Sequence, residues 1–134
     1  MWRSWEGLVC TAGSTGFGPY SPLVAGFRHA VRGVWVARSG TNFRIHLTAA
    51  ATALVVAAAY GLRRTHLALV VLAIVAVLAA ELLNTAIERI CDLIAQVNGL
   101  GWDERIRDIK DLSAGAVLVI CAGAAVVGAI VFVE

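Results

Sequence analysis

Charged residues are scarce in this chain of 134 residues, where aspartate, glutamate, lysine and arginine together make up 15%. A soluble domain usually has about a quarter of its residues charged. The formal net charge of +2 is too small to suggest a nucleic-acid partner. Hydrophobic residues make up 60% of the chain. The composition therefore predicts one compact unit that is embedded in a membrane.

The sequence also lacks the patterns of several common functional sites. Its three cysteines, Cys10, Cys91 and Cys121, are spaced neither as a disulfide framework nor as a zinc site. The three histidines lack the spacing of metal ligands. No Gly-x-x-x-x-Gly-Lys sequence is present, which excludes a P-loop kinase.

Residues 1–21 are predicted to be a variable N-terminal extension. They contain no apolar core long enough for a cleavable signal peptide. The stretch 11–19 contains three glycines and one proline, and both residue types oppose helix formation. We expect this extension to be poorly ordered.

Residues 22–38 are predicted to form a helix. Pro22 suits a first helical turn, and Ser21 suits an N-cap. Phe27 and Trp35 repeat at helical spacing, and the basic residues lie largely on another side. A basic helix with aromatic residues opposite its charges tends to lie flat in the headgroup layer. An ordinary amphipathic helix packed on protein would have the same pattern.

Three apolar stretches are each long enough to cross the ~30 Å hydrocarbon layer of a membrane. We predict spans at about 44–62, 67–97 and 111–133. The second stretch has no proline or glycine before Gly99, so it predicts one helix whose last turns extend into water. The first and third are rich in small residues, which favours close helix packing in lipid.

The basic residues predict the orientation of these spans. Arg63 and Arg64 follow the first span, whereas eight others from residue 28 onward lie before it or at its start, in the last turns of the second span, or between the second and third. Because cytoplasmic loops carry an excess of lysine and arginine, the N-terminus is predicted to be cytoplasmic and the C-terminus to lie outside. The eight residues are Arg28, Arg32, Arg38, Arg44, Arg89, Arg105, Arg107 and Lys110.

Four polar residues of the second span, which we call the acidic ridge, are Glu81, Asn84, Glu88 and Asp92. At ~100° per helical residue, their positions fall within roughly 80° of one another. A carboxylate inside the hydrocarbon layer costs several kcal/mol, so Glu81 is expected to serve a function. The alternative is that Glu81 lies close enough to the interface to be an ordinary surface residue.

Carboxylates at different depths suit different chemistry. A partly desolvated one, such as Glu81, has a raised proton affinity and can act as a general base. One nearer to water stays ionised and can hold a divalent cation, and Mg²⁺ prefers oxygen ligands that include substrate phosphates. Lys110 is placed to supply a positive charge for those phosphates.

Three segments of the chain resemble the bacterial diacylglycerol kinases and undecaprenol kinases, a family of small integral-membrane lipid kinases. The block 81–88, Glu-Leu-Leu-Asn-Thr-Ala-Ile-Glu, followed by Asp92, closely resembles the signature of that family. The block 110–117 resembles its second motif, and 42–47 resembles its segment before the first span. The resemblance extends over about 27–133.

This resemblance implies an all-α membrane protein, a homotrimer with three spans and a surface helix in each chain. It implies that phosphate passes from ATP, with Mg²⁺, to a lipid hydroxyl at the cytoplasmic face of the bacterial cell membrane. Glu81 is then the general base, and Glu88 holds the metal. The nucleotide and phosphate site comprises Asn84, Asp92, Lys110 and Asp111. Further candidates for contact with lipid or nucleotide are Arg28 and Arg44.

The chain departs from the family pattern at two places. A second metal-binding glutamate usually stands three residues before the Phe-Arg pair, and here that position is Gly40. The connection 93–109 is also longer than usual.

The Gly40 departure motivates an alternative, a homologue without kinase activity that binds lipid. A small proton-coupled exporter is a second alternative, although three spans rather than four argue against it.

The lipid substrate is left open between undecaprenol and diacylglycerol, because both present a primary hydroxyl below an apolar body. The Asn-Phe-Arg-Ile-His and Leu-Leu-Asn-Thr blocks slightly favour undecaprenol.

Overall fold

The structure, a computed structural model, describes residues 22–99 and 103–133. These residues form four helices, with no strand among them: α1 (Pro22–Ala37), α2 (Thr41–Ala59), α3 (Arg64–Val97) and α4 (Glu104–Val133). The prediction of an all-α fold is therefore confirmed. The predicted extension 1–21, with the proposed cap Ser21, lies outside the described residues.

The chain divides into two units, residues 1–33 and 34–134, each of which is considered by itself. In the first unit, the described part of α1 exposes Phe27 and Val31. In the second, Trp35 is exposed, and the guanidinium carbon of Arg38 lies 3.9 Å from the centroid of its ring. The surface-lying role of 22–38 stays a prediction.

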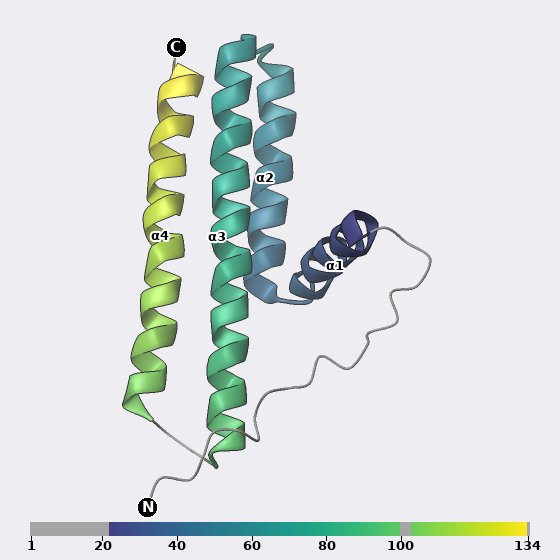
Figure 1. The fold of residues 1–134 in the computed structure, drawn as a ribbon. Helices are drawn as coiled ribbons and strands as arrows, with labels where there is room; N and C mark the ends of the chain where they lie inside the picture. The colour runs from purple at the N-terminus through teal and green to yellow at the C-terminus, as the bar shows by residue number, and fades with distance from the viewer. Residues whose placement is uncertain (1–21, 100–102, 134) are drawn as a thin grey trace, which may run out of the picture. The chain divides into compact units, whose positions relative to one another are not determined.

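In the second unit, α3 lies between α2 and α4 and packs against both, most extensively against α4 (Figure 1). The three helices alternate in direction, and each is long and apolar enough to cross a membrane. The 34 residues of α3 measure about 51 Å, well beyond the ~30 Å hydrocarbon layer. This agrees with the prediction of one continuous second helix that is longer than the membrane is thick.

Few side chains are buried inside this unit. The buried apolar residues include Ala57, Val70 and Val117, whereas Leu72 and Leu118 are exposed. An apolar exterior is what a helical unit surrounded by lipid or by other membrane-embedded helices presents. The structure thus agrees with the integral-membrane character that the composition predicts.

Glycines in left-handed conformation end two of the helices. Gly61, with φ of 63°, follows α2, and its N–H donates to the carbonyl of Ala58 while the N–H of Leu62 donates to that of Ala57. This is the paired pattern that ends a helix and reverses the chain. Gly99, with φ of 60°, follows α3 in the same way. Only glycine adopts this conformation without a steric cost.

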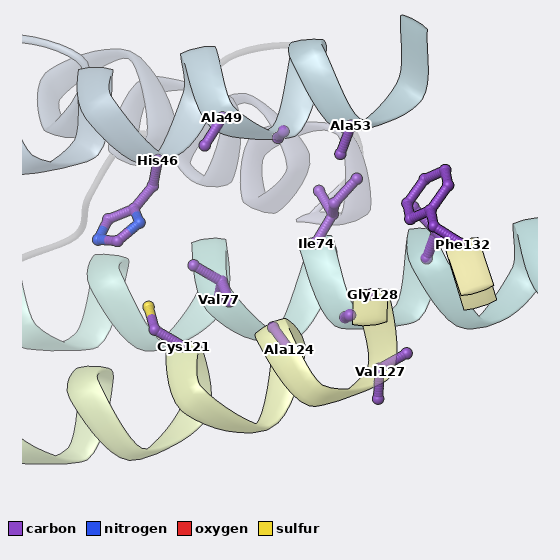
Figure 2. A pocket seen from close by; sticks show the side chains of 13 residues that line it. His46, Ala49, Ala53, Ile74, Val77, Cys121, Ala124, Val127, Gly128 and Phe132 are labelled. Carbon is purple, nitrogen blue, oxygen red and sulfur yellow. The ribbon is translucent and has the colours of Figure 1, made fainter. Parts of the chain in front are cut away.

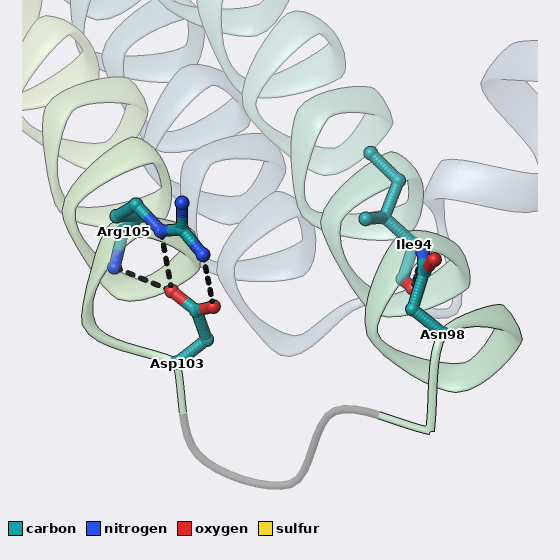
Figure 3. A network of polar contacts seen from close by, with 4 residues as sticks. All are labelled: Ile94, Asn98, Asp103 and Arg105. Atoms are coloured by element: carbon teal, nitrogen blue, oxygen red, sulfur yellow. Dashed lines mark hydrogen bonds and ion pairs between the residues drawn. The ribbon is translucent and has the colours of Figure 1, made fainter. Parts of the chain in front are cut away.

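Helix α4 begins seven residues before the predicted span at 111, so most of the charged segment forms its first turns. Asp103 caps this start, because its Oδ1 accepts a hydrogen bond of 2.9 Å from the backbone N–H of Arg105 (Figure 3). The guanidinium of Arg105 also pairs with the same carboxylate at 3.0 Å. At the end of α3, the amide of Asn98 donates to the carbonyl of Ile94 at 2.8 Å. Helix α4 therefore begins before the apolar stretch 111–133 that hydropathy alone assigns to the third span.

Candidate active site

A polar cleft of about 330 Å³ lies where α2 begins beside the middle of α3. Helix α3 contributes three carboxylates to it, those of Glu81, Glu88 and Asp92. The other wall is the break between α1 and α2 together with the first turn of α2, which includes Gly40. The structure thus brings the three acidic residues of the acidic ridge into one cleft. The remaining lining residues are Ser39, Thr41, Asn42, Thr85 and Arg89.

Glu81 is the most enclosed of these carboxylates, with 3% of its surface exposed. It lies in the apolar part of α3, between Ala80 and Leu82, whereas Glu88 is half-buried and Asp92 is exposed. His46 of α2 is close enough to interact electrostatically with Glu81. The three carboxylates therefore differ in their access to water, as the sequence predicts.

Asn84 faces α4 rather than the cleft. It is 3% exposed, and its Oδ1 accepts a hydrogen bond of 2.6 Å from Ser113 Oγ. Its Nδ2 donates to Glu88 Oε1 at 3.2 Å. Because Ser113 of α4 holds the amide oxygen of Asn84, the N–H₂ group of Asn84 points toward the carboxylate of Glu88. The interaction of Asn84 with Glu88 thus links the buried α3–α4 contact to the cleft.

Lys110 of α4 and Asp92 of α3 form an ion pair that joins the two helices. Lys110 Nζ lies 2.5 Å from Asp92 Oδ1, with side-chain exposures of 35% and 68%. A lysine held this way stays charged and close to the cleft, where it can turn toward an arriving phosphate. Exposed pairs contribute little stability, so exchange of partners costs little.

Two other candidate residues of the second unit do not line the cleft. Asp111 is exposed and pairs with Arg107 one turn earlier, at 3.6 Å. Arg44 lines a separate surface depression together with Trp35 and Arg38. Arg28 belongs to the first unit.

The fit of a magnesium ion can be judged from the oxygens in the cleft. Among residues 22–99 and 103–133, no three His, Cys, Asp or Glu side chains are grouped to hold a metal ion. Gly40 offers no side-chain oxygen, and Asp92 already has Lys110 as a partner. Mg²⁺ commonly binds through one or two carboxylates, with waters and substrate phosphates completing its shell. Glu88 therefore fits an ion that arrives with a nucleotide.

Two residues with a place in this site were missed by the sequence reasoning. Ser113 belongs to the block 110–117, but a serine in an apolar helix has no signal of its own, and only its contact with Asn84 reveals it. The spacing of His46 gives no sign of a ligand role, and the fold brings it within electrostatic range of Glu81. Both residues depend on how helices that are distant in sequence approach one another.

Comparisons with known proteins agree with this geometry. The family model described as prokaryotic diacylglycerol kinase matches residues 28–132. The chain is 35% identical over 107 residues to an undecaprenol kinase of Bacillus subtilis, covering 79% of this chain and 84% of that protein. It is 36% identical over 107 residues to a diacylglycerol kinase of Synechocystis, covering 79% of this chain and 59% of that protein.

No solved structure matches the chain significantly. The family model covers most of the chain, and the acidic ridge that suggested the resemblance lies within the match. The names of the family and of both relatives indicate lipid kinases, which are phosphotransferases. The chain belongs to the prokaryotic diacylglycerol kinase family.

Proposed function

We propose that this protein transfers the terminal phosphoryl group of ATP to the hydroxyl of a membrane lipid, giving the lipid monophosphate. The observation that carries the proposal is the position of Glu81, a carboxylate with 3% exposure in a long apolar helix, in the same cleft as Glu88 and Asp92. A buried carboxylate can meet a hydroxyl held in the membrane, and exposed ones can meet a water-soluble nucleotide.

In the reaction, Glu81 accepts the proton of the lipid hydroxyl as the oxygen attacks the terminal phosphorus of ATP. The bond from that phosphorus to the bridging oxygen breaks, and ADP leaves. Lys110 moves from Asp92 toward the phosphates and neutralises part of their charge. Phosphoryl transfer depends mainly on such positioning and charge neutralisation.

Glu88, held by the amide of Asn84, is the residue that would hold Mg²⁺. The ion would supply positive charge that offsets the charge developing on the phosphates. Asp92 completes the polar surroundings of the nucleotide, and Asn84, which faces α4, acts on them through Glu88. Asp111 and Arg44 contribute polar contacts to nucleotide or lipid, and Arg28 contacts lipid headgroups.

We further propose that the chains form a homotrimer in a bacterial cell membrane, with the N-terminus in the cytoplasm and the C-terminus outside. Exposed apolar residues on all three long helices support burial against lipid or further copies. Glu81 lies 17 residues after Arg64, about 26 Å along α3, which is close to the far side of a ~30 Å hydrocarbon layer.

Purified protein incubated with labelled ATP, magnesium and either undecaprenol or diacylglycerol tests the proposal. We expect label in the lipid monophosphate. Glu81→Gln should abolish transfer and leave the folded oligomer intact, while the matched variant Glu104→Gln, at an exposed position on α4, should retain it. Undiminished transfer by Glu81→Gln would remove Glu81 from the role of base.

Gly40 supports a second candidate, a lipid-binding homologue without kinase activity. It stands in the cleft wall at the position of the usual second metal-binding glutamate. Absence of lipid phosphorylation by the wild-type protein, together with saturable binding of the same lipids, would favour that candidate.

A further inference from the structure

A second cavity, which we call the apolar groove, runs along the three long helices and has a volume of about 320 Å³ (Figure 2). Apolar side chains line most of it. His46 of α2 stands at one end with its ring turned toward α3, and it is the one basic side chain among the described residues that line the groove. A charged group in such surroundings costs free energy unless an opposite charge lies near it.

The positions of two residue pairs place His46 beside Glu81, which has the opposite charge. On α2, Asn42 and His46 are four residues apart, so they share one helix face. On α3, the same spacing relates Glu81 and Val77. The polar cleft contains the first residue of each pair, and the apolar groove contains the second. Because α2 and α3 run in opposite directions (Figure 1), His46 lies level with the turn of α3 between Glu81 and Val77.

Neither of these two side chains is engaged elsewhere. Within residues 22–99 and 103–133, the imidazole of His46 and the carboxylate of Glu81 form no hydrogen bond or ion pair with other residues. The two groups interact with each other electrostatically across space. Such an attraction is stronger in low-dielectric surroundings than in water. A change at His46 should therefore be felt at Glu81 without direct contact.

The other charged groups of α3 in the cleft do not replace this interaction. Glu88 has the same charge as Glu81 and repels it. Asp92 is also acidic, and it is paired with Lys110. Arg89 is positive, but it is exposed and lies eight residues further along α3, about 12 Å from Glu81 along the helix axis.

Among the described residues, α2 and α4 offer no other cation at this level. Arg44 is two residues before His46, on nearly the opposite side of the helix, and it lines a separate depression. Helix α4 carries no charged side chain after Asp111. Its Cys121 lines the groove, but a thiol supplies no positive charge. His46 is therefore the cationic partner that the fold provides for Glu81.

We propose that His46 is a positioning residue whose imidazolium keeps the carboxylate of Glu81 ionised and turned toward the boundary of cleft and groove, ready to accept a proton. This rests on the proposed kinase function and adds to it a residue that acts through the base. Burial favours the neutral form of a carboxyl group, and a neutral carboxyl group cannot accept the proton. A nearby positive charge opposes that effect and lets the base work at lower pH.

The pH dependence of lipid phosphorylation tests the pair, with whichever of undecaprenol and diacylglycerol the wild type phosphorylates. His46→Gln removes the positive charge at similar size. The acidic midpoint of its kcat/KM for the lipid should lie about one pH unit higher than in the wild type, a tenfold change in proton concentration. At alkaline pH the variant should match the wild type, because Glu81 is then ionised without help. The KM for ATP should not change.

Two further variants show whether the charge is the cause. His46→Lys keeps a cation and should keep the acidic midpoint close to that of the wild type, and His46→Arg replaces it if thermal unfolding in detergent shows that it does not fold. His66→Gln makes the same change 15 residues, about 22 Å, before Glu81 on α3 and should follow the wild-type profile. A loss in His46→Gln that is equal at every pH, or that a cation does not restore, would assign His46 to packing or to substrate contact and overturn the proposal.

Infrared difference spectroscopy follows the protonation of Glu81 without turnover. The carbonyl band of the protonated carboxyl group is assigned to Glu81 by its absence in Glu81→Gln. In His46→Gln this band should appear at a pH about one unit higher than in the wild type, and an unchanged pH would refute the role of His46. If the wild type phosphorylates no lipid, the kinase proposal fails by itself, and this titration still decides whether His46 controls the charge of Glu81.

Discussion

Ser113 Oγ on α4 donates a hydrogen bond of 2.6 Å to Asn84 Oδ1 on α3, and the two residues are 29 positions apart in the chain. Because Asn84 in turn donates to Glu88, a hydroxyl that touches no part of the cleft fixes the amide that orients the proposed metal ligand. The buried packing of α3 on α4 and the chemistry of the cleft are therefore coupled through one side chain.

Removal of that hydroxyl should therefore affect both stability and metal use. Ser113→Ala leaves the buried Asn84 oxygen without its partner, which should lower the free energy of unfolding by about 1–3 kcal/mol. The magnesium concentration for half-maximal rate should rise as well. A double-mutant cycle with Asn84→Ala, measured by thermal unfolding in detergent, should show coupling between the two positions. Additive effects would contradict the link.

Glu88 should control the magnesium requirement. Glu88→Gln keeps the size of the side chain and removes its charge, so the magnesium concentration for half-maximal rate should increase by about tenfold, a factor that corresponds to about 1.4 kcal/mol. The rate of lipid phosphorylation is measured against magnesium at saturating ATP. Glu104→Gln, at an exposed site, is the control, and an unchanged requirement in Glu88→Gln would count against its role as a ligand.

A carboxylate added at Gly40 should strengthen metal binding in the cleft. The φ of −74° at Gly40 is open to any residue, although a Cβ there would lie 3.2 Å from the carbonyl oxygen of Ala37 and require a small shift. Gly40→Glu should therefore lower the magnesium requirement below that of Gly40→Ala, which carries the same steric cost without the charge. Equal requirements in the two variants would show that position 40 does not reach the metal.

Lys110 should matter for ATP and little for stability. Lys110→Met removes the charge proposed for the phosphates and should raise the KM for ATP by about tenfold, while the partly exposed pair with Asp92 contributes at most about 1 kcal/mol to folding. Arg107→Met, on the same helix, is the comparison. Steady-state kinetics and thermal unfolding separate the two effects, and an equal rise in KM in both variants would argue against a specific phosphate contact.

The start of α4 should depend on pH through Asp103. Hydrogen bonds from the Arg105 side chain and backbone hold the pKa of the Asp103 carboxyl below its usual value. The stabilisation is therefore present above the unfolded pKa of about 3.9 and is lost as pH falls through the lower, folded value. Asp103→Ala should be less stable than the wild type at neutral pH, and the difference should vanish in strong acid. A difference in stability that persists unchanged in strong acid would contradict this role of Asp103.

The helices and the acidic ridge were predictable from the sequence, because both are local properties. The long apolar runs between polar breaks, and Gly99 after the second of them, indicate where helices form, and four residues on one helix need no partner to share a face. The first predicted span ran through Gly61 to residue 62, whereas α2 ends at Ala59, because Gly61 adopts the left-handed conformation that stops the helix. The start of α4 was predicted seven residues late, because hydropathy marks the lipid-facing length of a helix and not its hydrogen-bonded length.

Only the tertiary structure decided which helix faces meet. The sequence placed Asn84 with the carboxylates, but packing directs its oxygen to Ser113, and the approach of α2 to α3 brings His46 beside Glu81 and Gly40 into the cleft. Such contacts depend on how side chains interlock between helices far apart in the chain. No window of local sequence carries that information, because the same apolar periodicity is compatible with several rotations of one helix against another.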